Sequence, residues 1–134
     1  MYKKVMIAID GSEIANQALI EAVNVVNSYN GSLCIVHCIT DDTAENVRKG
    51  NAVLDKAKSD IDTLSVETNL LQADVQYGLN GIAEAIANAV ADWKADLLVV
   101  GTSNRRGLER LFIGSVAEQL IAKVDSSILL VRPQ

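Results

Sequence analysis

The stretch that decides the fold is DLLVVGTSNRRGLERLFIGSVAEQLIAKVDSSILLVR, residues 96–132. It opens with an apolar run, residues 96–101, that is typical of a parallel strand buried on both faces. A loop with glycines at both ends follows, and from Ser115, a suitable N-cap, the apolar positions take helical spacing. Glycines let the backbone approach a ligand, and the first amides of a helix are unpaired donors at the positive end of its dipole. This order of elements therefore predicts a phosphate site.

The glycine spacing identifies the type of loop. Neither a Walker loop nor a Gly-x-Gly-x-x-Gly fingerprint is present. The pattern Gly101-x2-Asn104-x9-Gly114-Ser115 resembles the Gly-x2-Gly-x9-Gly-[Ser/Thr] nucleotide loop of the universal stress protein family, with Asn104 in place of the middle glycine. Residues 4–12 resemble that family's first strand and adenine-side aspartate, and residues 127–133 resemble its last strand, so the resemblance covers the whole chain.

Length and composition limit the classes of protein. With 134 residues, of which 49% are apolar, we expect one domain over residues 1–134 with an ordinary core. The net charge of -5 argues against nucleic acid as a partner. No segment has the ~18 consecutive apolar residues of a membrane span, and the first residues lack a signal-type cleavage site. We therefore expect a cytoplasmic protein with no membrane partner.

The two cysteines and the single histidine do not suggest metal chemistry. Cys34 and Cys38 lie four residues apart in an expected strand, which separates their Cα atoms by about 13 Å and rules out a disulfide within it. His37 is expected on the opposite face of the sheet. Buried free thiols are the ordinary interpretation, and no metal site is predicted.

Strand and helix patterns alternate along the chain. We expect strands at residues 5–9, 33–39, 73–77, 96–101 and 127–131, and helices at 13–29, from near 41 to 64, at 82–93 and from 115. Such alternation predicts parallel strands joined by right-handed crossovers, with helices on both faces of a doubly wound α/β sheet. The resemblance supplies the strand order 3-2-1-4-5 and an adenine-nucleotide α-hydrolase-like architecture. In that order, strands 1 and 4 flank the point where ligands bind.

The resemblance also implies an ATP site, with or without Mg²⁺. Ala8, Ile9 and Asp10 match positions that meet adenine and ribose, and Asp10 can also stabilise the following helix through its dipole. Cys38 matches a small apolar position beside the base. The loop and helix positions that match the family's phosphate and ribose contacts are Val100, Gly101, Ser103, Asn104, Gly114, Ser115, Val116 and Ala117.

Three loop positions determine how well this site would work. Asn104 enters the left-handed backbone region more readily than most residues, although its side chain can obstruct a phosphate. Arg105 and Arg106 add cations for a phosphate tail, or else belong to a solvated loop.

The sequence argues against catalysis. The residues after the first strand, Asp10-Gly11-Ser12-Glu13, lack the Ser-Gly-Gly-x-Asp-Ser loop of ATP-pyrophosphatases of related architecture. With His37 as the single histidine, no Ser/His/Asp arrangement is expected. We expect a nucleotide-binding regulatory protein of the stress response with at most slow ATP hydrolysis. The alternatives are a dimeric stress protein that does not bind nucleotide and, with less support, a flavin electron carrier.

The last strand predicts a homodimer. Residues 127–131 are apolar on both faces, yet the expected order places them at an edge where backbone groups are unpaired. Antiparallel pairing with a second copy would satisfy those groups, as in many relatives of this family. The alternative is a monomer whose terminus and a neighbouring helix cover the edge.

Overall fold

The computed structural model describes residues 1–11, 13–61, 65–74, 79–101 and 115–132, and strand and helix alternate throughout these ranges. In chain order the elements are β1 Lys4–Ala8, α1 Glu13–Tyr29, β2 Ser32–Ile39, α2 Ala44–Ser59, β3 Val66–Gln72, α3 Leu79–Trp93, β4 Leu97–Gly101, α4 Ser115–Lys123 and β5 Ser127–Val131.

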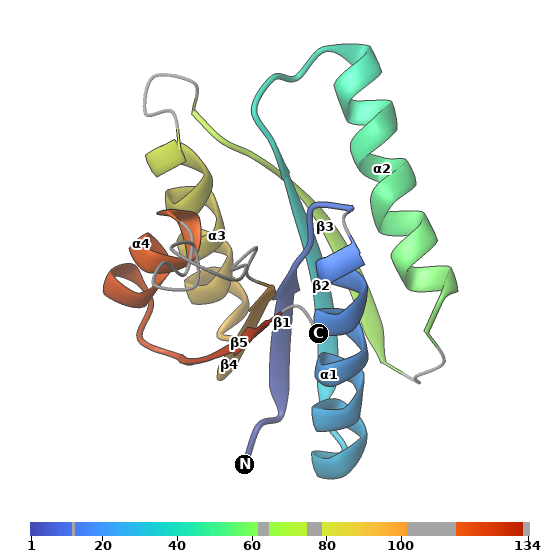
Figure 1. Ribbon diagram of the computed structural model, residues 1–134, viewed down its shortest axis with the longest axis vertical. Coiled ribbons are helices and arrows are strands. Elements are labelled where there is room, and N and C mark those ends of the chain that lie inside the picture. The colour runs from blue at the N-terminus through green and yellow to red at the C-terminus, as the bar shows by residue number, and fades with distance from the viewer. Residues whose placement is uncertain (12, 62–64, 75–78, 102–114, 133–134) are drawn as a thin grey trace.

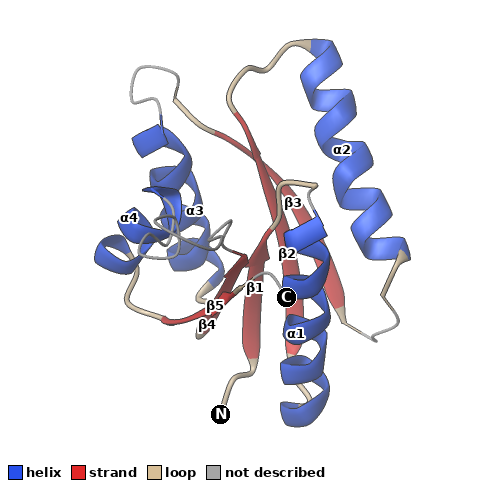
Figure 2. Cartoon of the chain, viewed as in Figure 1, coloured by secondary structure: helices blue, strands red, loops and turns tan. Residues whose placement is uncertain are grey.

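The five strands form one parallel sheet in the order β3-β2-β1-β4-β5. Figure 1 shows this sheet between two pairs of helices, α1 and α2 on one side and α3 and α4 on the other. Figure 2 shows the same separation of helices and strands by colour. The predicted doubly wound α/β fold is confirmed.

Each face of the sheet has its own apolar core. Alternate residues of β1, such as Val5 and Ile7, pack with α1 and α2, whereas Met6 packs with α3 and α4. This division follows from the period of two along a strand. Because both faces of β1 and β4 are covered, their sequences are continuously apolar, as the sequence pattern indicated.

The amino ends of β1 and β4 are joined by one carboxylate. Asp96 accepts hydrogen bonds from the backbone amides of Lys3 (2.9 Å) and Lys4 (3.1 Å). In return, the Asp96 amide donates to the Lys4 carbonyl (2.8 Å). These contacts set the β1–β4 register and therefore the positions of the two carboxyl ends, where the predicted site lies.

Helix α2 begins at Ala44, later than the expected start near residue 41. The Thr43 hydroxyl accepts a hydrogen bond from the Asn46 amide (3.2 Å), and the Thr43 amide donates to Asp41 (3.0 Å). Thr43 is therefore the N-cap, and residue 41 belongs to the turn before the helix.

The predicted third strand was wrong. We expected residues 73–77, but β3 spans Val66–Gln72 and only Ala73 and Asp74 of the expected range are described. Ala73 donates its amide to Ile39 (2.8 Å) at the end of the ladder. The true strand was missed because β3 lies at the sheet edge and presents polar side chains such as Glu67 and Asn69 to solvent.

Candidate functional site

The carboxyl ends of β1 and β4 lie side by side, as predicted. Ala8 pairs with Val100 in the β1–β4 ladder, and Gly101 ends β4. On its other side β1 pairs with β2, so the winding of the sheet reverses between β1 and β4. Ligands of doubly wound folds bind at such a switch point. Two segments about ninety residues apart in sequence therefore meet at one edge of the sheet.

The chain turns sharply after β1. Ile9 is buried, Asp10 is exposed, and Gly11 has a φ of 86°. That φ lies in the left-handed region, which glycine adopts without steric cost. The turn brings Asp10 to the surface just before α1 begins at Glu13, where a carboxylate is favoured by the helix dipole.

A histidine fixes the backbone at this turn. The Ile9 amide donates to the Val36 carbonyl (2.9 Å), and His37 Nδ1 lies 2.7 Å from the Ile9 carbonyl oxygen. Because a carbonyl only accepts, Nδ1 carries the proton in this contact. The His37 ring also lies on the α2 side of the sheet, next to Gly50. Its predicted separation from the face that holds Cys34 is confirmed.

His37 was not among the site residues predicted from the sequence. The available signal was its position: Ala8 pairs with Val36, so the next residue of β2 lies beside Ile9. A polar side chain at that point can hydrogen-bond the backbone after β1. This placement of His37 depends on the β1–β2 register, which the sequence alone does not provide.

Cys38 lies near the carboxyl end of β2 and is half-buried. Burial raises the pKa of its thiol, and a backbone hydrogen bond from Ala73 offsets part of that rise. The thiol is therefore protonated at neutral pH and unreactive, which fits the predicted role as a wall. Cys34 and Cys38 are both free, as expected.

The start of α4 is partly different from the prediction. Ser115 is the first residue of the helix and not the residue before it. Ala117 is 7% exposed and belongs to the same core cluster as Val100, with Val116 packed against that cluster. The Ala117 side chain thus faces the core.

Four predicted site residues lie outside the described residues: Ser103, Asn104, Arg105 and Gly114. The described part of the site consists of the ends of β1, β2 and β4 and the first turn of α4. In the described ranges, no group of three or more His, Cys, Asp or Glu side chains is arranged to hold a metal ion. Nor does any described helix have the length and apolar character needed to cross a membrane.

Comparison with known proteins decides the family. The model of the universal stress protein family matches residues 1–132. The chain is a member of the universal stress protein family. A putative universal stress protein of Staphylococcus saprophyticus is 32% identical over 142 residues, which cover 99% of this chain and 85% of the relative.

Solved structures agree with the fold of this universal stress protein. One is the universal stress protein from Archaeoglobus fulgidus in complex with dAMP, with a TM-score of 0.77, 20% identity and coverage of 97% of this chain and 98% of that one. Another is a universal stress protein in complex with cAMP, with a TM-score of 0.69, 21% identity and coverage of 99% of this chain and 98% of that one. At these identities the likeness establishes the fold alone.

Proposed function

We propose that this universal stress protein binds an adenine nucleotide, with ATP as the expected ligand, at the carboxyl ends of β1 and β4. The observation that carries the proposal is the pairing of Ala8 with Val100, which brings the end of β1 next to Gly101, the first residue of the nucleotide-loop pattern. The structural relatives in complex with dAMP and cAMP support the same class of ligand.

The described residues suit the nucleoside half of such a ligand. The Cys38 thiol, neutral because its pKa is raised, offers an uncharged surface to a base. Exposed Asp10 offers acceptors to a sugar hydroxyl or an exocyclic amine. The phosphate half is assigned to the Gly101–Ser115 pattern from the sequence, with Arg105 as a nearby cation and Mg²⁺ as an optional partner of the phosphates.

The proposed output is regulatory, without turnover. A nucleotide at this position would touch the ends of three strands and the first turn of α4, so binding would alter the shape or partners of one cytoplasmic domain. We propose that the protein acts as a homodimer paired through β5. This strand lies at the edge of the sheet, and its residues Ile128 to Val131 are only half-buried. A dimeric module without nucleotide is the second candidate, because Asn104 stands where the pattern has glycine.

Calorimetric titration with ATP, in the presence and absence of Mg²⁺, tests the proposal. Replacing Gly114 with Val should abolish binding, because a branched side chain would occupy space that the phosphate needs. Gly107→Val is the matched control, since it places the same side chain at a glycine of the same loop that is not one of the fixed positions of the pattern. Equal ATP affinity in wild type and Gly114→Val would refute the phosphate assignment. No heat with any adenine nucleotide would favour the second candidate.

A further inference from the structure

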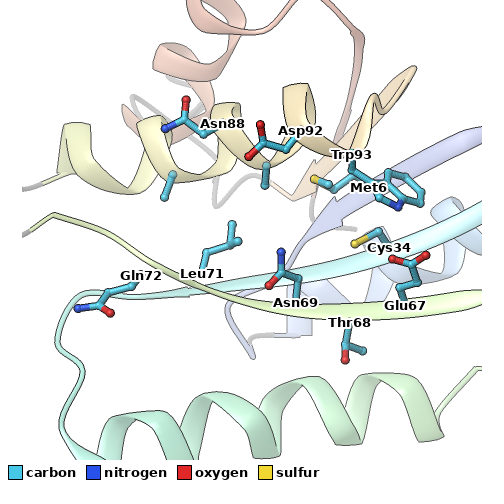
Figure 3. A pocket seen from close by; sticks show the side chains of 12 residues that line it. Met6, Cys34, Glu67, Thr68, Asn69, Leu71, Gln72, Asn88, Asp92 and Trp93 are labelled. Carbon is cyan, nitrogen blue, oxygen red and sulfur yellow. The ribbon is translucent and has the colours of Figure 1, made fainter.

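A groove between β3 and α3 lies apart from the nucleotide site. It has a volume of about 470 Å³ and shares no lining residue with the predicted nucleotide contacts. Figure 3 shows β3 along one side and α3 along the other. Its lining residues are Met6, Cys34, Glu67, Thr68, Asn69, Leu71, Gln72, Ala85, Asn88, Ala89, Asp92 and Trp93.

The β2–β3 register explains why polar side chains line the β3 side. Cys34 pairs with Glu67, and Val36 pairs with Asn69. Residues paired in a parallel ladder point to the same face of the sheet. Glu67 and Asn69 therefore face α3, whereas Thr68 points away toward α2 (Figure 3).

The floor of the groove is apolar and contains a buried thiol. Cys34 is 3% exposed, and its sulfur points into the groove (Figure 3). Within the part of the chain that the structure describes, this thiol has no hydrogen bond. Burial, followed by the charge of Glu67, raises its pKa to about 11, so the thiol stays neutral and is a poor nucleophile. The floor thus offers a soft, polarizable surface for a non-covalent ligand.

The two walls carry unpaired polar groups. Glu67 and Asn69 project from β3, and Asn88 and Asp92 project from α3. Among the described residues, none of these four side chains makes a hydrogen bond or an ion pair. The ammonium of Lys4 stands 4.4 Å from the centroid of the Trp93 ring, at the end of the groove where Glu67 also lies. Among the described residues, the lining includes two carboxylates, Glu67 and Asp92, and no cationic side chain, so the groove carries negative charge that Lys4 offsets only at one end.

We propose that this groove binds a small organic cation, namely an ammonium or amidinium group carried on an apolar body. The volume lies within the range of about 300–1,000 Å³ that small-molecule sites occupy. Met6, Leu71 and Ala89 would contact the body of the ligand, while Glu67 and Asp92 would pair with its charge. Anions are disfavoured by the same carboxylates.

Phenethylamine is a suitable probe, and phenethyl alcohol is its neutral partner of the same shape. Two-dimensional amide NMR of the nitrogen-labelled protein would follow the titration. The amine should produce saturable shifts at residues 67–71 and 88–93, including the indole NH of Trp93, the only tryptophan of the chain. The alcohol should bind several-fold more weakly. Equal affinities, or no saturable shift in these segments at millimolar amine, would overturn the proposal.

Charge-neutralising variants locate the contact. Glu67→Gln and Asp92→Asn should each weaken phenethylamine binding about two- to fivefold, the range expected for exposed ion pairs. Glu21→Gln removes the same charge from an exposed position on α1, on the opposite face of the sheet, and should leave the affinity unchanged. If all three variants weaken binding equally, the amine responds only to net charge and the groove is not its site.

Discussion

Gly31 offers a direct test of how the sheet is assembled. A Cβ atom at this position would lie 2.8 Å from the carbonyl oxygen of Lys3 and 2.9 Å from that of Tyr2. These oxygens belong to backbone that cannot move freely, because the Ser32 amide donates to the same Lys3 carbonyl (2.7 Å) and the Gly31 amide donates to Val26 (2.9 Å). Gly31→Ala should therefore strain the point where α1 passes into β2.

The expected magnitude follows from two opposing effects. Overpacking costs about 1–3 kcal/mol, whereas Gly→Ala lowers the entropy of the unfolded chain and recovers about 0.4–1 kcal/mol. We expect a net destabilisation of about 1–2 kcal/mol. With about 2.1 cal/mol/K per residue over 134 residues, the unfolding entropy is about 0.28 kcal/mol/K. The melting temperature should then fall by about 4–7 °C.

Gly50→Ala is the matched comparison. Its Cβ would lie 2.6 Å from Leu70 Cδ1 and 3.0 Å from Ile39 Cγ2, which are ends of side chains and can shift. Gly50 also lies inside α2, where alanine gains about 1 kcal/mol in helix propensity. The two effects should leave stability within about 1 kcal/mol of wild type.

Urea and thermal denaturation followed by circular dichroism would measure both variants. Gly31→Ala should lower the denaturation midpoint clearly more than Gly50→Ala, with an unchanged dependence on urea concentration. A Gly31→Ala protein as stable as wild type would show that the β1–β2 entry is not held as tightly as the oxygen distances indicate. The Gly31→Ala strain should also reach the proposed nucleotide site, because the same β1–β2 ladder ends at Ala8 and Val36.

Four further predictions concern the assembly, the proposed nucleotide site and the buried thiol of the groove. Val131→Asp should convert a dimer into monomers in sedimentation, because it places a charge in the edge strand; a wild type that is already monomeric at micromolar concentration would refute pairing through β5. Asn104→Gly should leave the ATP affinity measured by calorimetry unchanged or increase it, and a tenfold increase would correspond to about 1.4 kcal/mol. Loss of binding would instead mean that the Asn104 side-chain amide contacts the ligand. His37→Phe removes the hydrogen bond to Ile9 and should lower the unfolding free energy, measured by urea titration, by about 0.5–1.5 kcal/mol; it should also weaken nucleotide binding. If neither the unfolding free energy nor the nucleotide affinity changes, His37 does not position the turn after β1. The pKa of Cys34 rises from 9.0 to about 11 on folding, so the thiol of the unfolded chain ionises at a lower pH than that of the folded protein. The free energy of unfolding of wild type, measured relative to Cys34→Ala, should therefore fall between pH 9 and 11. A difference between the two proteins that stays constant over this pH range would argue against a buried neutral thiol.

The topology could be predicted because the decisive signals are local. Apolar runs such as residues 96–101 mark strands that are covered on both faces, and the intervening helical spacing requires parallel crossovers. The strand order came from the family resemblance, since periodicity alone does not choose among orders. The prediction that the carboxyl ends of strands 1 and 4 lie together followed from that order, and the pairing of Ala8 with Val100 confirms it.

The details of the site depended on contacts that the sequence does not encode locally. From the sequence, His37 was considered for a metal site and for a Ser/His/Asp arrangement, and its hydrogen bond to Ile9 becomes visible once β1 and β2 are in register. Ala117 matched a ligand position by spacing, but the rotation of α4 turns its side chain into the core. In both cases the orientation of one element relative to another decides the role.

The missed strand β3 is informative because polar side chains interrupt the apolar pattern on both of its faces. Its α2 face packs, since Val66 and Leu70 lie against the first core cluster. On the α3 face Glu67 and Asn69 stand where the neighbouring strand carries Cys34 and Val36, both buried. Thr68, between Val66 and Leu70 on the α2 face, is also polar and exposed, whereas Leu71 on the α3 face packs against the second core cluster. This mixed pattern obscured the strand in the sequence, and it also places two polar side chains along the groove that we propose binds a cation.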